Sequence, residues 1–236
     1  MFKSLGVGVL VLALAACGAP RTRQGTPQRP DESAGRPELP VGGTVYQVDQ
    51  AQSELRILVF RAGPLAHFGH NHVMVNRTIR GAVSVADAPD PPAFWLSVPA
   101  AGFVVDDAQA RAEEGADFAA AVPDDARSGT LQNMLGAAVL DAAEFPSITV
   151  KSLRVSAAQD AANPGAMTAA VTVGVAGHES TIDVPFTLQS EPGRLSATGR
   201  VELRQTDLGL TPYSLILGAL QVQDAMTVKF KIVALP

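Results

Sequence analysis

The sequence predicts an all-β domain built on an antiparallel sheet that closes into a barrel, with one main α-helix packed on it. From Tyr46 onward, apolar and polar residues alternate with a period of two, which places every second side chain on one face of a strand. Turn-like segments such as Glu191-Pro192-Gly193 separate these strands at near-regular spacing. So many one-sided strands predict a sheet with one dry face, and closing that sheet removes its edges.

The alternating segments occur in both halves of the chain. Their apolar positions are Leu55, Ile57 and Val59; Ile79, Val83 and Val85; Met167, Ala169, Val171, Val173 and Val175; Ile182, Val184, Phe186 and Leu188; Leu195, Ala197, Val201 and Leu203; and Met226, Val228, Phe230 and Ile232. The residues between them are mostly polar, as Asp183 and Thr187 illustrate. Each segment therefore predicts a half-buried strand.

Two irregularities interrupt this pattern. The apolar phase slips between Val150 and Leu153, which predicts a β-bulge near Lys151 or Ser152 that bends the sheet. Pro185 has no amide hydrogen to donate to a neighbouring strand, so we expect it at an edge or a bulge.

One segment has helical rather than strand periodicity. From Ala126 to Ala142, apolar residues recur at helical spacing, and Pro146 forbids continuation, so this segment is the predicted main helix. The segment from Ala108 to Ala121 is rich in Ala and Glu and predicts a weaker second helix, which can cap a barrel mouth.

The amino terminus has the layout of a secretory signal. Lys3 supplies positive charge, Leu5 to Leu14 form an apolar run too short to span a bilayer, and small residues precede a cysteine. Leu14-Ala15-Ala16-Cys17 fits a lipobox, in which Cys17 is acylated after cleavage. An ordinary signal peptidase site is the alternative. We expect a signal peptide over residues 1–16 and a lipid anchor at Cys17, with Gly18 favouring the outer membrane and a periplasm-facing envelope lipoprotein.

Composition sets further limits. Cys17 is the only cysteine, so its acylation leaves no thiol for a disulfide or a nucleophile. Residues 17–43 contain repeated prolines and little to bury, which indicates a disordered tether. The remaining residues, 44–236, suffice for one domain with a sizeable core. The net charge of −5 and the lack of a basic run argue against nucleic acid as a partner.

The order of several short motifs resembles the YceI-like family from about Thr44 to the end of the chain. The motifs are Tyr46-x-Val48-Asp49, Ser53, Gly81, Leu140-Asp141, Phe145-Pro146-x-Ile148, Asp207-Leu208-Gly209 and the closing segment Val228 to Ile232. The resemblance implies an extended lipocalin-like antiparallel barrel of about eight strands, an envelope or secreted location, a bound polyisoprenoid and a homodimer. Arg127 and Asp141 follow the family pattern, whereas Leu140 stands where an aromatic residue is common.

Three of the four histidines, His67, His70 and His72, lie in one loop between the second and third predicted strands. In an extended segment His70 and His72 project to the same side, and Gly69 allows a bend that brings His67 toward them. The loop has three interpretations: hydrogen bonding across the barrel mouth, contact with the polar head of a ligand, or ligation of a metal such as zinc or copper, or of haem. His178 lies in a separate predicted hairpin turn.

Other polar groups give no catalytic signature. The acidic pairs Asp106-Asp107, Glu113-Glu114 and Asp124-Asp125 lack the spacing of a calcium loop, so we expect solvated surface. The sequence contains no Gly-x-Ser-x-Gly elbow, no His-Glu-x-x-His and no phosphate-binding glycine loop. We therefore assign no catalytic residue and expect a binding protein rather than an enzyme.

The apolar faces are the better candidates for function. The residues proposed to line a ligand site are Phe94, Trp95, Met167, Val184, Phe186, Tyr213 and Phe230. We expect a lipid-anchored binding protein that holds a long isoprenoid, such as a quinone or a polyprenyl lipid, and the sequence identifies no certain cofactor. The alternatives are a metal-, haem- or redox-handling protein that uses the histidine loop, and a structural module whose barrel is filled by its own side chains.

Overall fold

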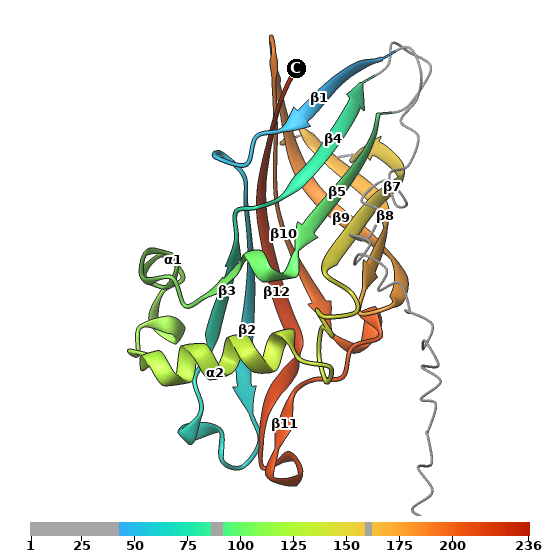
Figure 1. Cartoon of the computed structure of the whole chain (residues 1–236). Coiled ribbons are helices and arrows are strands. Elements are labelled where there is room, and N and C mark those ends of the chain that lie inside the picture. The colour runs from blue at the N-terminus through green and yellow to red at the C-terminus, as the bar shows by residue number, and fades with distance from the viewer. Residues whose placement is uncertain (1–42, 86–91, 159–161) are drawn as a thin grey trace, which may run out of the picture. The chain divides into compact units, whose positions relative to one another are not determined.

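The computed structural model describes residues 43–85, 92–158 and 162–236 (Figure 1). The predicted signal peptide, Cys17 and all of the predicted tether except Gly43 lie outside the described residues. No helix in these three ranges is long and apolar enough to cross a membrane.

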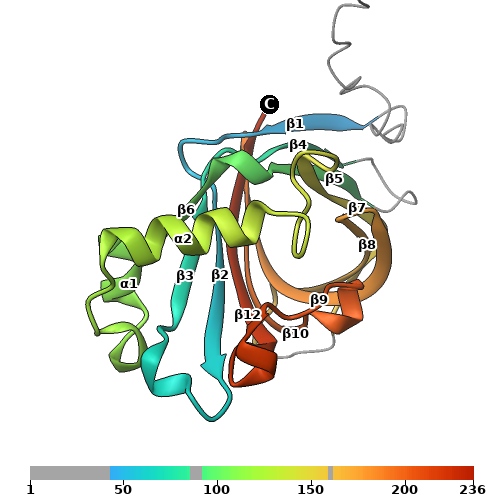
Figure 2. The same cartoon turned by 60° about the horizontal axis from the view of Figure 1, so that its bottom comes forward.

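Eight strands form a closed antiparallel barrel, which confirms the predicted fold class (Figures 1 and 2). Around the barrel they follow the order β1 (Thr44–Val48), β4 (Arg80–Val85), β5 (Ala93–Pro99), β7 (Ser147–Ala157), β8 (Ala166–Val175), β9 (His178–Glu191), β10 (Arg194–Arg204) and β12 (Leu220–Leu235). The barrel closes where β1 pairs with the end of β12, in the register Gln47↔Leu235 and Val48↔Ala234. The described residues of the unit from Pro37 to Pro236 contain all of these pairings and both hydrophobic cores, as expected of a domain that folds by itself.

A second layer branches from β12, which is long enough to pair with four other strands along its length: β1, β2 (Glu54–Ala62), β10 and β11 (Ser214–Leu215). Closer to its beginning, β12 pairs with β2 instead of β1. Strand β2 pairs in turn with β3 (His72–Asn76), and β3 pairs with β6 (Phe103–Val105). The short strand β11 pairs with the beginning of β12. The sheet therefore extends past the barrel at one end (Figure 1).

Strands β2 and β3 are apolar on both faces. One face turns Leu55, Ile57 and Val59 toward the barrel interior. The other face packs under the helix α1 (Ala108–Glu113) and the 3-10 turn η3 (Ala116–Phe118), in a second core made of Leu58, Val73, Val75, Ala110 and Phe118. The predicted sheet with a single dry face is thus wrong for this layer, because a helix covers its outer side.

The main helix, α2 (Asp124–Leu135), lies across one end of the barrel (Figure 2). It ends at Leu135 rather than at the predicted Ala142, because the Gly136 amide caps the carbonyls of Gln132 and Asn133 and the backbone becomes extended there. The second helix is also shorter than predicted, since Gly115 has φ 85° and breaks the segment after α1. It packs on the outside of β3 and does not cap the mouth.

Three local predictions are confirmed. The β7–β8 register shifts between Ser152 and Arg154, at the predicted bulge. The predicted turns lie between β8 and β9 and between β9 and β10. Pro185 lies at an edge, because the pairing of β9 with β10 ends at Thr187↔Thr198 and only β8 pairs with β9 beyond that point.

Candidate ligand-binding cavity

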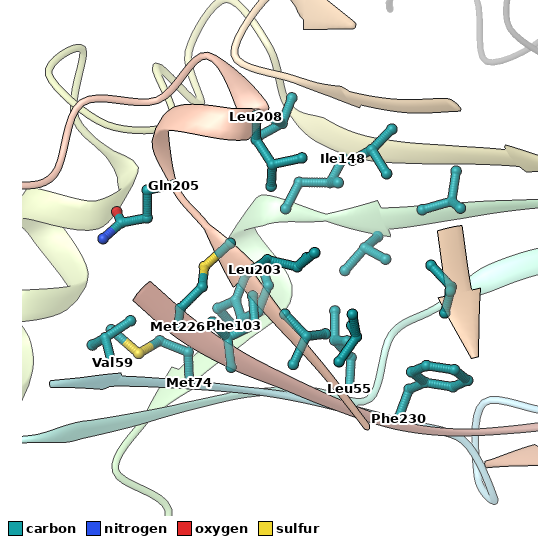
Figure 3. A pocket seen from close by; sticks show the side chains of 18 of the residues that line it. Leu55, Val59, Met74, Phe103, Ile148, Leu203, Gln205, Leu208, Met226 and Phe230 are labelled. Carbon is teal, nitrogen blue, oxygen red and sulfur yellow. The ribbon is translucent and has the colours of Figure 1, made fainter. Parts of the chain in front are cut away.

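The barrel encloses a cavity of about 480 Å³. Its walls are the inward faces of the alternating strands, where aliphatic and aromatic side chains predominate. Figure 3 shows this lining, with Gln205 at one end and the ring of Phe230 at the other. Cavities of this size and composition are typical of sites for slender apolar ligands.

The structure places five of the seven predicted lining residues in this cavity: Phe94, Val184, Phe186, Tyr213 and Phe230. Trp95 does not line it, because it follows Phe94 in β5 and adjacent residues of a strand point to opposite faces. Met167 is also not in the lining. It begins the inward face of β8 and packs instead against the first hydrophobic core, whose buried residues include Ala169 and Val171.

Polar groups gather where the cavity reaches α2. They come from the end of β2, the loop before β3, the middle of α2 and the segments beside β10 and β12. They are Arg61, His70, His72, Thr130, Asn133, Gln205, Gln221 and Tyr213. Among the described lining residues Arg61 is the only charged side chain, and its guanidinium donates to the Gly69 carbonyl at 2.7 Å. The cavity is therefore a long apolar chamber with one polar end.

His72 is held at this polar end by an acidic partner. Its Nδ1 lies 2.7 Å from Oδ2 of Asp106, whose side chain is completely buried, and its Nε2 lies 3.3 Å from Oγ1 of Thr130 on α2. With the carboxylate ionised, Nδ1 carries the proton and donates it, so the Nε2 of a neutral ring is left as an acceptor. The carboxylate thus fixes the tautomer and the orientation of the ring.

Asp106 is itself fixed by a buried network. Its Oδ1 accepts from the Val73 amide at 3.0 Å and from Arg111 Nη1 at 2.5 Å. Arg111 also donates to the carbonyls of Asn71 and Ala120, and its guanidinium lies 5.8 Å from the centre of the Phe118 ring. Burial alone would raise the pKa of Asp106, but the hydrogen bonds from His72, Val73 and Arg111 outweigh it and lower that pKa.

The other two loop histidines behave differently from His72. The His70 ring lines the cavity with its centre 6.1 Å from that of His72. His67 does not line the cavity. Its ring stacks on Phe68, with the centres 3.9 Å apart, so the predicted convergence of three histidines is wrong. Within the described ranges no group of three or more His, Cys, Asp or Glu side chains is arranged to hold a metal ion, and the metal interpretation gains no support.

His178 also stays apart from the loop. It begins β9, where its ring packs against the backbone of Gly209, and it is not in the cavity lining. The segment that contains Gly209 lies beside the parts of β9 and β10 that do not pair with each other. Its Leu208 and Leu210 line the cavity.

Two of the acidic pairs are not the solvated surface that the sequence predicted. Asp106 is buried, and Glu114, with 3% of its side chain exposed, forms ion pairs with Arg56 and Lys229. Asp107 accepts from the Ala110 amide and caps α1. An acid directly after the apolar strand residues Phe103 to Val105 was the signal for burial, but only the fold shows that His72 and Arg111 meet it.

Comparisons with known proteins agree with this architecture. The crystal structure of BcnA from Burkholderia cenocepacia matches with a TM-score of 0.56 at 15% identity, over 79% of this chain and 99% of that one. A polyisoprenoid-binding domain from Saccharophagus degradans, implicated in plant cell wall breakdown, matches with a TM-score of 0.51 at 13% identity, over 80% of this chain and 97% of the other. Among curated proteins, the sequence has no match.

A closed antiparallel barrel around an apolar chamber, crossed at one end by a helix, defines a lipocalin-like protein. Residues 46–234 match the sequence model of the YceI-like domain. The chain belongs to the YceI-like family.

Proposed function

We propose that this chain is a binding protein that holds one long isoprenoid lipid, a quinone or a polyprenyl lipid, with its tail along the barrel and its polar end beside His72. The observation that carries the proposal is the distribution of polarity in the cavity. The strand faces that line its length are apolar, and the polar groups lie together at the end near α2. The S. degradans domain of the same fold, described as polyisoprenoid-binding, supports the same ligand class.

The tail supplies most of the binding free energy in this proposal. Burial of each methylene group contributes about 0.8 kcal/mol, so the affinity rises with chain length until the chamber is full. The apolar walls offer no hydrogen-bonding groups to a tail. They therefore select ligands by the length and width of the tail rather than by polar groups on it.

The polar end fixes the direction in which the ligand lies. Arg61, Asn133 and Gln221 can donate hydrogen bonds to a carbonyl or another oxygen of a head group. When its ring is neutral, His72 presents Nε2 as an acceptor, 3.3 Å from the Thr130 hydroxyl, and a ligand hydroxyl, as in a hydroquinone or a polyprenol, can replace that contact. No carboxylate lines the described cavity, so the oxygen atoms of a head group meet no negatively charged side chain there.

We further propose that Cys17 is acylated and anchors the domain in the cell envelope, facing the periplasm, with the outer membrane favoured. The support is the lipobox spacing of Leu14 to Cys17 and the single cysteine. Binding rather than catalysis is the proposed activity, because the polar residues at the cavity serve to orient a ligand and to hold one another in place.

Solvent extraction of the purified domain tests the carrier function. Residues 37–236, expressed without the anchor, are extracted with organic solvent, and the lipids are identified by mass spectrometry. The delipidated domain is then titrated with prenyl quinones of increasing tail length. We expect a co-purified isoprenoid or an affinity that rises with tail length. An empty domain with no dependence on tail length would instead indicate a barrel filled by its own side chains.

A further inference from the structure

Two loops at the α2 end of the barrel expose large apolar side chains. Phe68, in the 3-10 turn η1 (Ala66–Phe68), is 70% exposed. Leu215, at the end of β11, is 44% exposed, and Leu217, in the turn η5 (Ile216–Gly218), is fully exposed. We call these three residues the apolar rim. They are three of the eight large hydrophobic residues that are exposed in the described ranges, and the rest are distributed over other strands and loops.

The two loops form one surface. The Leu65 amide donates to the Ala219 carbonyl at 2.8 Å, which joins the η1 loop to the hairpin between β11 and β12. Gly63 packs so closely that a side chain there would come within 2.6 Å of the same carbonyl oxygen. Figures 1 and 2 both show this hairpin and the loop after β2 side by side.

The apolar rim borders the mouth of the cavity. Gly69, which follows Phe68, lines the cavity, and so do Leu215 and Leu220 from the hairpin. Leu215 is both part of the lining and 44% exposed, so the chamber reaches solvent at this point. The apolar surface therefore runs from the outside of the molecule into the chamber through Leu215 and Leu220.

The backbone at Leu217 gives an independent indication. Its φ and ψ of 53° and 38° are left-handed, a conformation that Gly and Asn adopt at lower cost than Leu. Its side chain is fully exposed, so no packing within the described chain compensates for that cost. A contact with something outside the molecule would account for a leucine at this tip.

The charge pattern indicates what that contact is. The chain carries no acidic residue from position 55 to 86 or from 208 to 223, although its net charge is −5. The same segments supply His67, whose ring contacts Phe68, and Arg61, which donates to the carbonyl of the next residue, Gly69. An apolar surface that is built from segments without acidic residues and flanked by a cation fits a bilayer that contains anionic phospholipid.

We propose that the apolar rim inserts into the surface of a lipid bilayer, so that the cavity mouth opens toward the acyl chains. A lipid tail then passes between bilayer and barrel without crossing water. This transfer role rests on the carrier function proposed above. Without such contact the tail would expose its methylene groups to water during transfer. Docking itself does not depend on a bound isoprenoid.

Vesicle flotation tests the docking. The domain of residues 37–236 is used, because an acyl anchor would hold the full chain on the membrane by itself. It is mixed with vesicles of phosphatidylethanolamine and phosphatidylglycerol and compared with the double variant Phe68→Ser/Leu217→Asn. Each substitution removes apolar surface from the apolar rim, so we expect binding to weaken at least about tenfold. Leu153→Asn, at a residue that is 61% exposed on the β7 bulge, is the matched control and should bind as the wild type does.

The variant separates docking from folding. Asn adopts the left-handed conformation more readily than Leu, so a single Leu217→Asn variant should keep or raise the melting temperature while it lowers vesicle binding. Three results would overturn the proposal: a wild-type domain that does not float with vesicles, a double variant that floats equally well, or an equal loss in Leu153→Asn. A dimer in sedimentation that the double variant abolishes would also overturn it, because a second copy would then occupy the surface.

Uptake of a prenyl quinone from dilute ethanol distinguishes this proposal from the carrier function. The double variant should take up the quinone from ethanol normally but extract it more slowly from vesicles. Rim-dependent flotation without any quinone uptake would leave the docking proposal standing and would remove the carrier function.

Discussion

The Nδ1 atom of His72 lies 2.7 Å from the carboxylate of Asp106, and these two residues join the cavity to the second core. His72 lines the chamber, whereas Asp106 is buried behind it with Arg111 and the Val73 amide. Asp106 also has a positive φ of 57°, so its backbone as well as its side chain is fitted to this position. The polar end of the chamber is therefore preorganised by a network that does not itself contact the chamber.

Replacing Asp106 with Asn should destabilise the domain by about 3 kcal/mol at neutral pH, because it leaves the buried Arg111 guanidinium without its counter-charge. Chemical denaturation of the domain measures this loss. Asp183→Asn, an exposed site on β9, is the control and should change the free energy of unfolding by less than about 0.5 kcal/mol. Equal stability of the wild type and Asp106→Asn would show that the network is not an ionic one.

The same pair predicts a pH dependence. The pKa of Asp106 is lower in the folded chain than its ordinary value of 3.8. The stabilisation is therefore complete above that value and is lost as the pH falls toward and below the folded-state pKa. The stability difference between wild type and Asp106→Asn should narrow as the pH falls below 3.8, as thermal melts over an acid pH series would show. A gap that widens in acid would contradict the assignment.

Two glycines predict opposite effects of one extra methyl group. A Cβ at Gly199 would lie 2.4 Å from the Phe230 ring and 2.8 Å from the Pro185 carbonyl oxygen. Gly199→Ala should therefore destabilise the domain by about 1–3 kcal/mol and displace a ring that lines the cavity. Gly129, within α2, has open space around it, so Gly129→Ala should stabilise the domain by about 0.5–1 kcal/mol. Calorimetric melting of the two variants checks both signs.

Cys17→Ala should release the protein from the membrane or leave it unprocessed, because the acyl chains are its proposed stable anchor. Fractionation of cells that express each form, with the mass of the mature amino terminus, measures this. Apolar rim contacts alone are weak and reversible, so they should not retain the processed variant through a carbonate wash. Wild-type retention in the processed Cys17→Ala form would refute the lipobox prediction.

Alternation of polarity was sufficient to predict most of the barrel, because in a strand with one buried face every second residue is apolar. The bulge between Ser152 and Arg154 was visible for the same reason, as a slip in phase. The helix boundary was not, since the apolar residues of positions 137–142 continue the helical spacing while Gly136 ends the helix. The pair Phe94-Trp95 shows a further limit, because composition marked both as lining residues and only strand geometry separates them.

The polar network was beyond local pattern. Asp106 looked like part of an exposed acidic pair, because its partners His72 and Arg111 are brought to it by the pairing of β3 with β6 and by the return of α1. Likewise, Leu58 and Phe60 break the expected alternation of β2, since an element far along the chain covers that face. Contacts between segments far apart in the chain determine which charged residues are buried, and these contacts cannot be predicted from local patterns in a single sequence.

The carrier function makes its sharpest prediction at two adjacent residues of β9. Val184 faces the cavity, and Asp183 faces solvent on the same strand. Val184→Gln puts an amide among apolar side chains, where its hydrogen bonds to water are lost against a bound tail, so prenyl quinone affinity should fall by about tenfold or more. Asp183→Gln introduces the same side chain on the outer face and should leave affinity within about twofold, because the cavity is unchanged. Titration of both delipidated variants with a long-tailed quinone, monitored by tryptophan fluorescence or calorimetry, measures the contrast. Equal affinities for the two variants would mean that the ligand does not lie along the inner face of β9, and the barrel would no longer be the lipid site.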